Sequence, residues 1–297
     1  MERTVTGLVK LLRYRFLLVA GLLPYGLGAA IAFYSQGGEF SPFLFLVGLI
    51  GLLFVLIGVE TFNEFFDWMI GTDRVFQLNP KPVASRTFFV GIAGFFVALI
   101  VAIYLTLELG VAIIILSLIG FFAAFFYLGP PIKLAYRGFG EIIIALSYGP
   151  FLMLGSYYVQ TQRMDVLPLS VSVIPALLLF GISILNEVPD YFQDRLVGKR
   201  NICVRIGQKN VVRLYGGITA LFYTFLLVGL FSGKFPYLAW LVLVCLPISL
   251  ICYISGMRTQ ENPHRFVSTI RYMMIHYVIV LSILITSYIV DKTFYKG

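Results

Sequence analysis

A short acidic pattern, Asn-Glu-x-x-Asp, occurs twice in the chain, each time near the end of a long apolar run. Its members are Asn63, Glu64 and Asp67 in the first copy, and Asn186, Glu187 and Asp190 in the second. A further carboxylate follows each copy, namely Asp73 and Asp194. The chain has only 14 acidic residues in 297, so two such clusters are more than surface decoration. Carboxylates where two hydrophobic helices end predict a divalent-metal site that faces an apolar substrate.

Helical spacing places these groups on common faces, because residues three, four and seven positions apart lie on one side of a helix. The first face carries Glu60, Asn63, Glu64 and Asp67, and the second carries Ser183, Asn186, Asp190 and Asp194. An uncompensated charge in the hydrocarbon core costs at least about 2.5 to 3.5 kcal/mol. Both faces are therefore expected to point into a polar cavity. Mg²⁺ would be held there by carboxylates together with substrate phosphates.

Two interpretations without catalysis stay open for these acids. Carboxylates could cap helices or pair as solvated loop charges with Arg74, Arg195 and Lys199, although the repetition of the pattern speaks against this. The two copies are 123 residues apart, which indicates an internal repeat with spans two to five echoed by spans six to nine. Such repeats are common in membrane proteins that bind substrates between their halves. A transporter of a lipid-like anion is therefore a rival to an enzyme.

The composition defines the environment in which this chemistry would take place. The chain is 60% hydrophobic and 12% charged, with a mean hydropathy of +0.94. Charged residues make up about a quarter of an ordinary soluble domain, so this chain has roughly half the usual share. A soluble fold of this length could not bury so much apolar surface. The sequence therefore predicts a polytopic membrane protein.

Nine apolar runs are long enough to cross a bilayer, which requires about 20 helical residues. They lie near residues 15–34, 42–66, 88–107, 110–128, 139–159, 166–187, 212–231, 236–254 and 268–290. Long continuous runs favour helices over a β-barrel, whose strands alternate over about ten residues. We expect an all-α fold in a single transmembrane domain over residues 1–297. Its third and fourth helices would form a tight hairpin.

The basic residues predict how these helices are oriented in the membrane. On a nine-span topology, eighteen Lys and Arg residues fall on the side of the N-terminus and four on the other side. The positive-inside rule assigns the richer side to the cytoplasm. The N-terminus is therefore expected inside and the C-terminus outside, with compact loops that favour a prokaryotic plasma membrane. The net charge of +8 is a topology signal and predicts no nucleic-acid partner.

The two acidic motifs resemble signatures of the UbiA superfamily of intramembrane prenyltransferases. The first copy resembles its Asn-Asp-x-x-Asp motif, and Asp190 to Asp194 resembles its Asp-x-x-x-Asp motif. Residues 127–160 and 190–207 are similar to the menaquinone-type branch (1,4-dihydroxy-2-naphthoate prenyltransferases) and its vitamin K2-synthesising animal relatives. Glu64 stands where the family usually has Asp. Residues 75–82 are less typical of the menaquinone branch.

The resemblance implies nine transmembrane helices around a central cavity, with a cytoplasmic cap. It further implies Mg²⁺-dependent transfer of a prenyl group, geranyl or longer, from a prenyl diphosphate to an aromatic acceptor through an allylic carbocation. The metal ligands would be Asn63, Asp67, Asp73, Asp190 and Asp194. The acceptor would resemble 1,4-dihydroxy-2-naphthoate. The alternatives are 4-hydroxybenzoate, haem or a glycerol phosphate lipid.

Further residues are candidates for catalysis and substrate binding. The catalytic candidates are Asp67, Asp190, Asp194 and Lys133, the last of which the family-like segment PPIK positions. The candidates for substrate contact are Asn63, Lys133, Arg137, Tyr127, Tyr148, Asn186, Arg74 and Arg195. The arginines could instead anchor the topology, and the tyrosines could serve packing. Glu141 is a functional candidate as an ionisable group inside a span, or else pairs with Arg137 four residues earlier.

Overall fold

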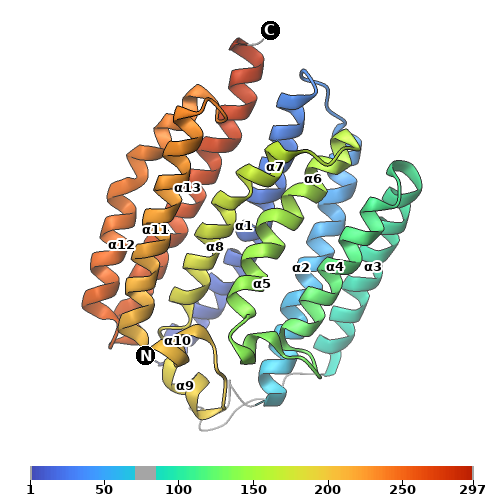
Figure 1. Cartoon of the computed structure of the whole chain (residues 1–297). Coiled ribbons are helices and arrows are strands. Elements are labelled where there is room, and N and C mark those ends of the chain that lie inside the picture. The colour runs from blue at the N-terminus through green and yellow to red at the C-terminus, as the bar shows by residue number, and fades with distance from the viewer. Residues whose placement is uncertain (1, 71–84, 296–297) are drawn as a thin grey trace.

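A computed structural model of the chain describes residues 2–70 and 85–295, and all regular structure in these ranges is helical (Figure 1). Seven segments have the length and composition of membrane spans: Pro42–Met69, Arg86–Leu109, Gly140–Thr161, Val166–Asn186, Gln208–Phe231, Tyr237–Thr259 and Pro263–Asp291. Val19–Ser35 and Ala112–Tyr127 are shorter apolar helices. The predicted all-α membrane protein is confirmed. The count of nine membrane-crossing helices stays a prediction, because two of the nine segments are short.

One part of the bundle packs around the long C-terminal helix. It consists of α1 (Glu2–Ser35), α7 (Val166–Val171), α8 (Val173–Asn186), α11 (Gln208–Phe231), the 3₁₀ helix η4 (Tyr237–Cys245), α12 (Leu246–Thr259) and α13 (Pro263–Tyr295). These helices share a continuous apolar core that includes Leu27, Leu179 and Val280. The N-terminal end of α1 and the C-terminal end of α13 lie at opposite ends of the bundle (Figure 1).

The other part of the bundle comes from the first half of the chain. It consists of α2 (Pro42–Ile70), α3 (Ser85–Leu109), α4 (Ala112–Leu128), α5 (Gly140–Leu146), the π-helical turn η3 (Ser147–Phe151) and α6 (Leu152–Thr161). The predicted hairpin between the third and fourth spans is present. Its turn includes Gly110, whose φ of +105° favours glycine.

Proline interrupts several apolar runs that are predicted as unbroken helices. Pro150 lies in the π-helical turn between α5 and α6, and Pro175 follows the break between α7 and α8 at Ser172. The eighth run starts as the 3₁₀ helix η4 and becomes α-helical where Pro247 occupies the first turn of α12. Proline has no N–H to donate, so local 3₁₀ or π geometry satisfies the backbone around it.

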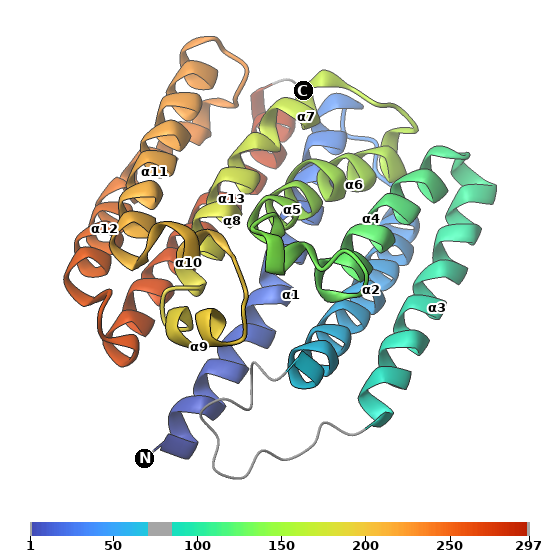
Figure 2. The ribbon, with the colours of Figure 1, turned by 60° about the horizontal axis from the view of Figure 1, so that its bottom comes forward.

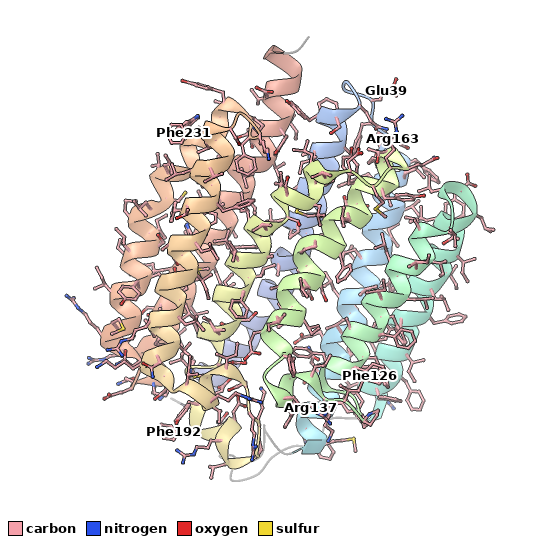
Figure 3. The ribbon with its side chains drawn as sticks, viewed as in Figure 1. Glu39, Phe126, Arg137, Arg163, Phe192 and Phe231 are labelled. Atoms are coloured by element: carbon pink, nitrogen blue, oxygen red, sulfur yellow. The ribbon has the colours of Figure 1, made fainter. Side chains whose placement is uncertain are left out.

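Three short helices cover one end of the bundle, which we call the motif end. They are η2 (Leu134–Arg137), α9 (Tyr191–Leu196) and α10 (Ile202–Ile206). Figure 2 brings this end forward and shows α9 and α10 on one side of it and η2 on the other. Side chains confirm which end is which: Arg137 and Phe192 lie at the motif end, whereas Glu39, Arg163 and Phe231 lie at the opposite end (Figure 3).

The main apolar core does not extend through the whole bundle. Among the described residues, its members come from α1, α6 to α8, α10 to α13 and η4, and α2, α3 and α4 contribute none. A smaller cluster of Leu105, Leu109, Ile113 and Val159 joins α3, α4 and α6 at the end opposite the motif end. Leu105, Ile113 and Val159 of this smaller cluster also line a cavity.

Candidate active site

The cavity has a volume of about 1180 Å³ and is lined mainly by α2, α3 and α4. Smaller parts of its wall come from α5, η3, α6, the end of α8, the loop around α9 and the start of α13. Apolar side chains such as Phe95, Leu99 and Phe121 line most of it. The charged side chains in its wall come from the end of α2, the start of α5 and the α8–α10 region, at the motif end. The cavity is therefore acidic at one end and apolar along the rest, as an amphipathic substrate requires.

The structure brings the two acidic motifs to this cavity from opposite sides. Asn63 and Asp67 reach it from α2, Asn186 from the end of α8, and Asp190 and Asp194 from the segment that follows. Asn63, Asp67 and Asp194 are buried, while Asp190 is exposed. Asp73 and Arg74 lie outside the described residues, and Glu64 is absent from the described cavity wall.

The Asp194 carboxylate has two partners, one ammonium group and one amide group. The Lys199 Nζ lies 3.3 Å from its Oδ2, and the Asn201 Nδ2 donates a hydrogen bond to the same oxygen at 2.6 Å. Burial raises the pKa of Asp194, Lys199 lowers it, and the nearby Asp67 raises it again, with a net rise. Burial would lower the pKa of Lys199, but Asp194 and Asp67 raise it overall. The two motifs are thus electrostatically coupled, and Lys199 stays charged.

Glu141 pairs with backbone at the motif end, and among the described residues it forms no ion pair with Arg137. Its Oε1 accepts a hydrogen bond from the Ile202 N–H at 2.7 Å, and the Glu187 Oε2 accepts one from the Cys203 N–H at 3.3 Å. Burial raises the pKa of Glu187 well above its ordinary value, and the negative charge of the nearby Glu141 raises it further. Together the two carboxyl groups hold the N-terminus of α10.

The remaining predicted residues separate into those that line the cavity and those that do not. Tyr127 and Tyr148 line it from α4 and η3. Lys133, Arg137 and Arg195 are absent from its described wall. The Lys133 Nζ lies 6.0 Å from the centre of the Tyr136 ring. Arg137 is exposed at the surface of the motif end (Figure 3).

Lys199 lines the cavity, whereas the sequence alone predicts it only as an ion-pair partner in a solvated loop. A backbone hydrogen bond from the Lys199 N–H to the Asp194 C=O, 2.9 Å long, folds the chain back after α9. The left-handed Gly198, with φ of +78°, permits this turn. A Gly-Lys pair shortly after the second motif is therefore the sequence feature that could have identified Lys199 as a cavity residue.

The side chains at the motif end suit Mg²⁺. Asn63, Asp67, Asp190 and Asp194 offer only oxygen ligands from their carbonyl or carboxylate groups, and Asp67 raises the pKa of Asp194 across the cavity. Within the described ranges, no three Asp, Glu, His or Cys side chains are grouped as a complete metal site. Mg²⁺ is usually bound by one or two carboxylates plus waters and substrate phosphates, so incomplete protein ligation fits this ion.

Known proteins resemble this chain over most of its length. Residues 22–279 match the UbiA prenyltransferase family. The chain is 24% identical over 242 residues to a 1,4-dihydroxy-2-naphthoate octaprenyltransferase of Bacillus subtilis (strain 168), covering 78% of this chain and 75% of that protein. It is 25% identical to UbiA prenyltransferase domain-containing protein 1 of Xenopus tropicalis, covering 77% and 68%.

A solved structure shares the fold. The structure of a UbiA homolog from Archaeoglobus fulgidus bound to GPP and Mg²⁺ matches with a TM-score of 0.57 and 16% identity. The match covers 92% of this chain and 99% of the other. At this identity the likeness concerns the helical architecture.

Proposed function

Because the chain belongs to the UbiA prenyltransferase family, we propose that it transfers a prenyl group from a prenyl diphosphate to an aromatic acceptor similar to 1,4-dihydroxy-2-naphthoate. One observation carries this proposal: both acidic motifs line a single cavity whose remaining wall is largely apolar. The diphosphate would lie among Asp67, Asp190 and Lys199, and the isoprenoid tail would lie along the apolar wall. A prenyl diphosphate has this same division between a charged head and an apolar chain.

Asn63, Asp67, Asp190 and Asp194 would hold Mg²⁺, together with Asp73 outside the described residues. When bound, the metal ion neutralises the negative charge that develops on the leaving diphosphate. The structure of the Archaeoglobus fulgidus homolog is bound to GPP and Mg²⁺, which supports a prenyl diphosphate and Mg²⁺ as the ligands of this cavity. Lys199 adds a fixed positive charge beside Asp194 that can hold a diphosphate oxygen.

In the reaction, the bond between the first prenyl carbon and the diphosphate oxygen breaks, and its electron pair stays with the diphosphate. The allylic carbocation is then attacked by the electron-rich ring carbon of the acceptor that carries the carboxylate, which forms the new carbon–carbon bond. That ring carbon then loses its carboxylate as carbon dioxide, and the electron pair of the broken bond restores the aromatic ring. Tyr127 and Tyr148 line the cavity and would stabilise the cation with their ring faces. The apolar wall excludes water, which would otherwise capture the cation.

The acceptor and the orientation rest on separate observations. The Bacillus subtilis relative is named for 1,4-dihydroxy-2-naphthoate, which supports a naphthoate-like acceptor. On the predicted topology most basic residues fall on the side of the N-terminus, which supports a cytoplasmic motif end, an internal N-terminus and an external C-terminus. The donor would then be drawn from the cytoplasmic leaflet of the membrane in which the protein is integral.

The direct test uses purified protein with geranyl or geranylgeranyl diphosphate, with and without Mg²⁺, across naphthoate, hydroxybenzoate and glycerol phosphate acceptors. We expect Mg²⁺-dependent diphosphate release and a prenylated naphthoate. A prenylated product with another acceptor would contradict the acceptor alone. Donor binding without any product, together with flux across liposomes, would contradict the enzymatic role and favour a transporter.

The apolar wall also predicts where the tail lies. A Cβ added at Gly155 would meet no atom within 4 Å, and this residue lines the cavity, so a larger side chain would extend into the open space. We expect Gly155→Leu to lower the ratio of kcat/KM for geranylgeranyl over geranyl diphosphate by about tenfold, or about 1.4 kcal/mol. Competition between the two donors measures this ratio.

Gly217 provides the matched control, because a Cβ there also meets no atom, yet the residue lies on the exposed face of α11 away from the cavity. Gly217→Leu should leave the ratio unchanged. An unchanged ratio in Gly155→Leu would mean that the tail does not pass this part of the wall.

A further inference from the structure

Asn201 connects the acidic end of the cavity to the membrane helices. Its side chain is fully buried, and its Nδ2 donates a hydrogen bond to the Asp194 Oδ2 at 2.6 Å. Asp194 is itself buried at the end of the second motif. The same carboxylate oxygen lies 3.3 Å from Lys199, while the Oδ1 lies 3.4 Å from that ammonium group. Asn201 therefore contacts a predicted metal ligand directly.

The other end of the Asn201 amide fixes its orientation. The Oδ1 accepts a hydrogen bond from the Val204 N–H at 2.8 Å, which makes Asn201 the N-cap of α10. A backbone N–H can only donate and an ionised carboxylate can only accept. Rotating the amide by 180° would therefore face like groups toward each other at both ends. The N–H₂ group must point at Asp194.

The α10 end of this connection is anchored to the bundle by two further carboxyl groups. Glu141, at the start of α5, accepts from the Ile202 N–H, and Glu187, at the end of α8, accepts from the Cys203 N–H. The first three N–H groups of α10 thus have side-chain acceptors from three different segments. The position of Asn201 is consequently determined by α5 and α8 rather than by the short α9 alone.

We propose that Asn201 is a positioning residue that holds the Asp194 carboxylate in its orientation toward the bound diphosphate and metal ion. This inference rests on the proposed function. The Asn201 amide occupies one side of the Oδ2 atom and prevents rotation of the carboxylate, so that the remaining lone pairs face the cavity. Groups that orient a metal ligand in this way typically change metal affinity or activity by about 10- to 100-fold when they are removed.

Replacing Asn201 with serine tests its two hydrogen bonds separately. A serine is a good N-cap but is too short to contact Asp194 while it caps α10. Asn201→Ser should therefore preserve the helix and release the carboxylate. Asn201→Ala removes both contacts. Asn201→Asp keeps the size and the capping oxygen but places a second carboxylate against Asp194, and we expect it to weaken binding more than serine does.

The experiment measures calorimetric binding of inorganic diphosphate in the presence of Mg²⁺ to the detergent-purified full chain, beside its Tm without ligand. For Asn201→Ser we expect a Tm close to that of wild type and a Kd at least about tenfold higher. Asn262 is the matched control, because its Oδ1 accepts from the Arg265 N–H at the start of α13, at an exposed site. Asn262→Ser should change neither quantity.

Two results would overturn the positioning role while the proposed function stands. One is a wild-type Kd in Asn201→Ser. The other is a parallel loss of Tm and affinity in the serine and alanine variants, which would indicate that Asn201 only supports the fold. Failure of the wild-type protein to bind diphosphate with Mg²⁺ would overturn the proposed function and this inference with it.

Discussion

Asp67→Asn is expected to reduce turnover by at least about 100-fold while the protein remains folded. Asp67 is buried in the cavity wall near the end of α2 and influences Asp194 across the cavity. The substitution keeps the size of the side chain but removes one negative charge from the predicted Mg²⁺ site. Charge stabilisation by a bound metal ion is worth several kcal/mol, and about 2.7 kcal/mol corresponds to 100-fold in rate.

The measurement is Mg²⁺-dependent release of diphosphate from geranylgeranyl diphosphate in the presence of acceptor, with Tm as the measure of folding. The useful comparison is Glu64→Gln on the same helix. Glu64 belongs to the same sequence motif, but it is absent from the described cavity wall, and we expect less than about fivefold loss. Equal losses in the two variants would contradict the roles assigned from the cavity. Full activity in Asp67→Asn would remove Asp67 from the catalytic site.

The helices and the first motif could be predicted because each depends on a local pattern. A membrane helix needs about 20 apolar residues, and residues three and four apart must share a face. Asn63 and Asp67 line the cavity from a continuous helix, as their spacing predicts. Glu60 and Glu64, which the same spacing places on this face, are absent from the described cavity wall. The breaks at Pro150 and Ser172 depend on how neighbouring backbone is satisfied, so apolar length alone could not predict them.

The motif end depends on contacts between distant segments, and its details could not be predicted in the same way. The sequence predicts that Glu141 acts in the site or pairs with Arg137. In the structure its carboxylate accepts a hydrogen bond from the Ile202 N–H, 61 residues away. Asn201 had no motif to identify it, because its role arises only when α10 packs against α5 and α8. Local spacing thus predicts that acids line the cavity, whereas the fold of the loops determines which groups surround them.

The same distinction applies to the two lysines of the motif end. The family-like segment PPIK favoured Lys133 as the cation that binds diphosphate, and it remains a predicted contact. In the structure, the ammonium groups of Lys133 and Lys199 each lie 6.0 Å from the centre of the Tyr136 ring, but only Lys199 is in the described cavity wall. Sequence similarity and cavity geometry therefore rank the two lysines differently.

Lys199→Met is expected to lower kcat/KM for the prenyl diphosphate by at least about 100-fold, and Lys133→Met by less than about tenfold. Methionine preserves most of the side-chain length and removes the charge. Truncating one partner of a buried charge pair costs about 2 to 5 kcal/mol, partly because the other charge stays buried without its partner. The comparison requires steady-state kinetics of both variants at saturating Mg²⁺ and acceptor, together with the Tm of each.

A second substitution separates the catalytic effect of Lys199 from its effect on stability. Lys199→Met leaves the largely buried Asp194 carboxylate without its cation, so its Tm should fall. Adding Asp194→Asn removes that uncompensated charge, and we expect the double variant to regain part of the lost Tm while it stays inactive. Recovery of turnover along with Tm would mean that Lys199 only stabilises the motif end. A larger kinetic loss in Lys133→Met than in Lys199→Met would instead assign the diphosphate to the family-like segment. The cavity lined by the two acidic motifs would then have to rearrange when the donor binds.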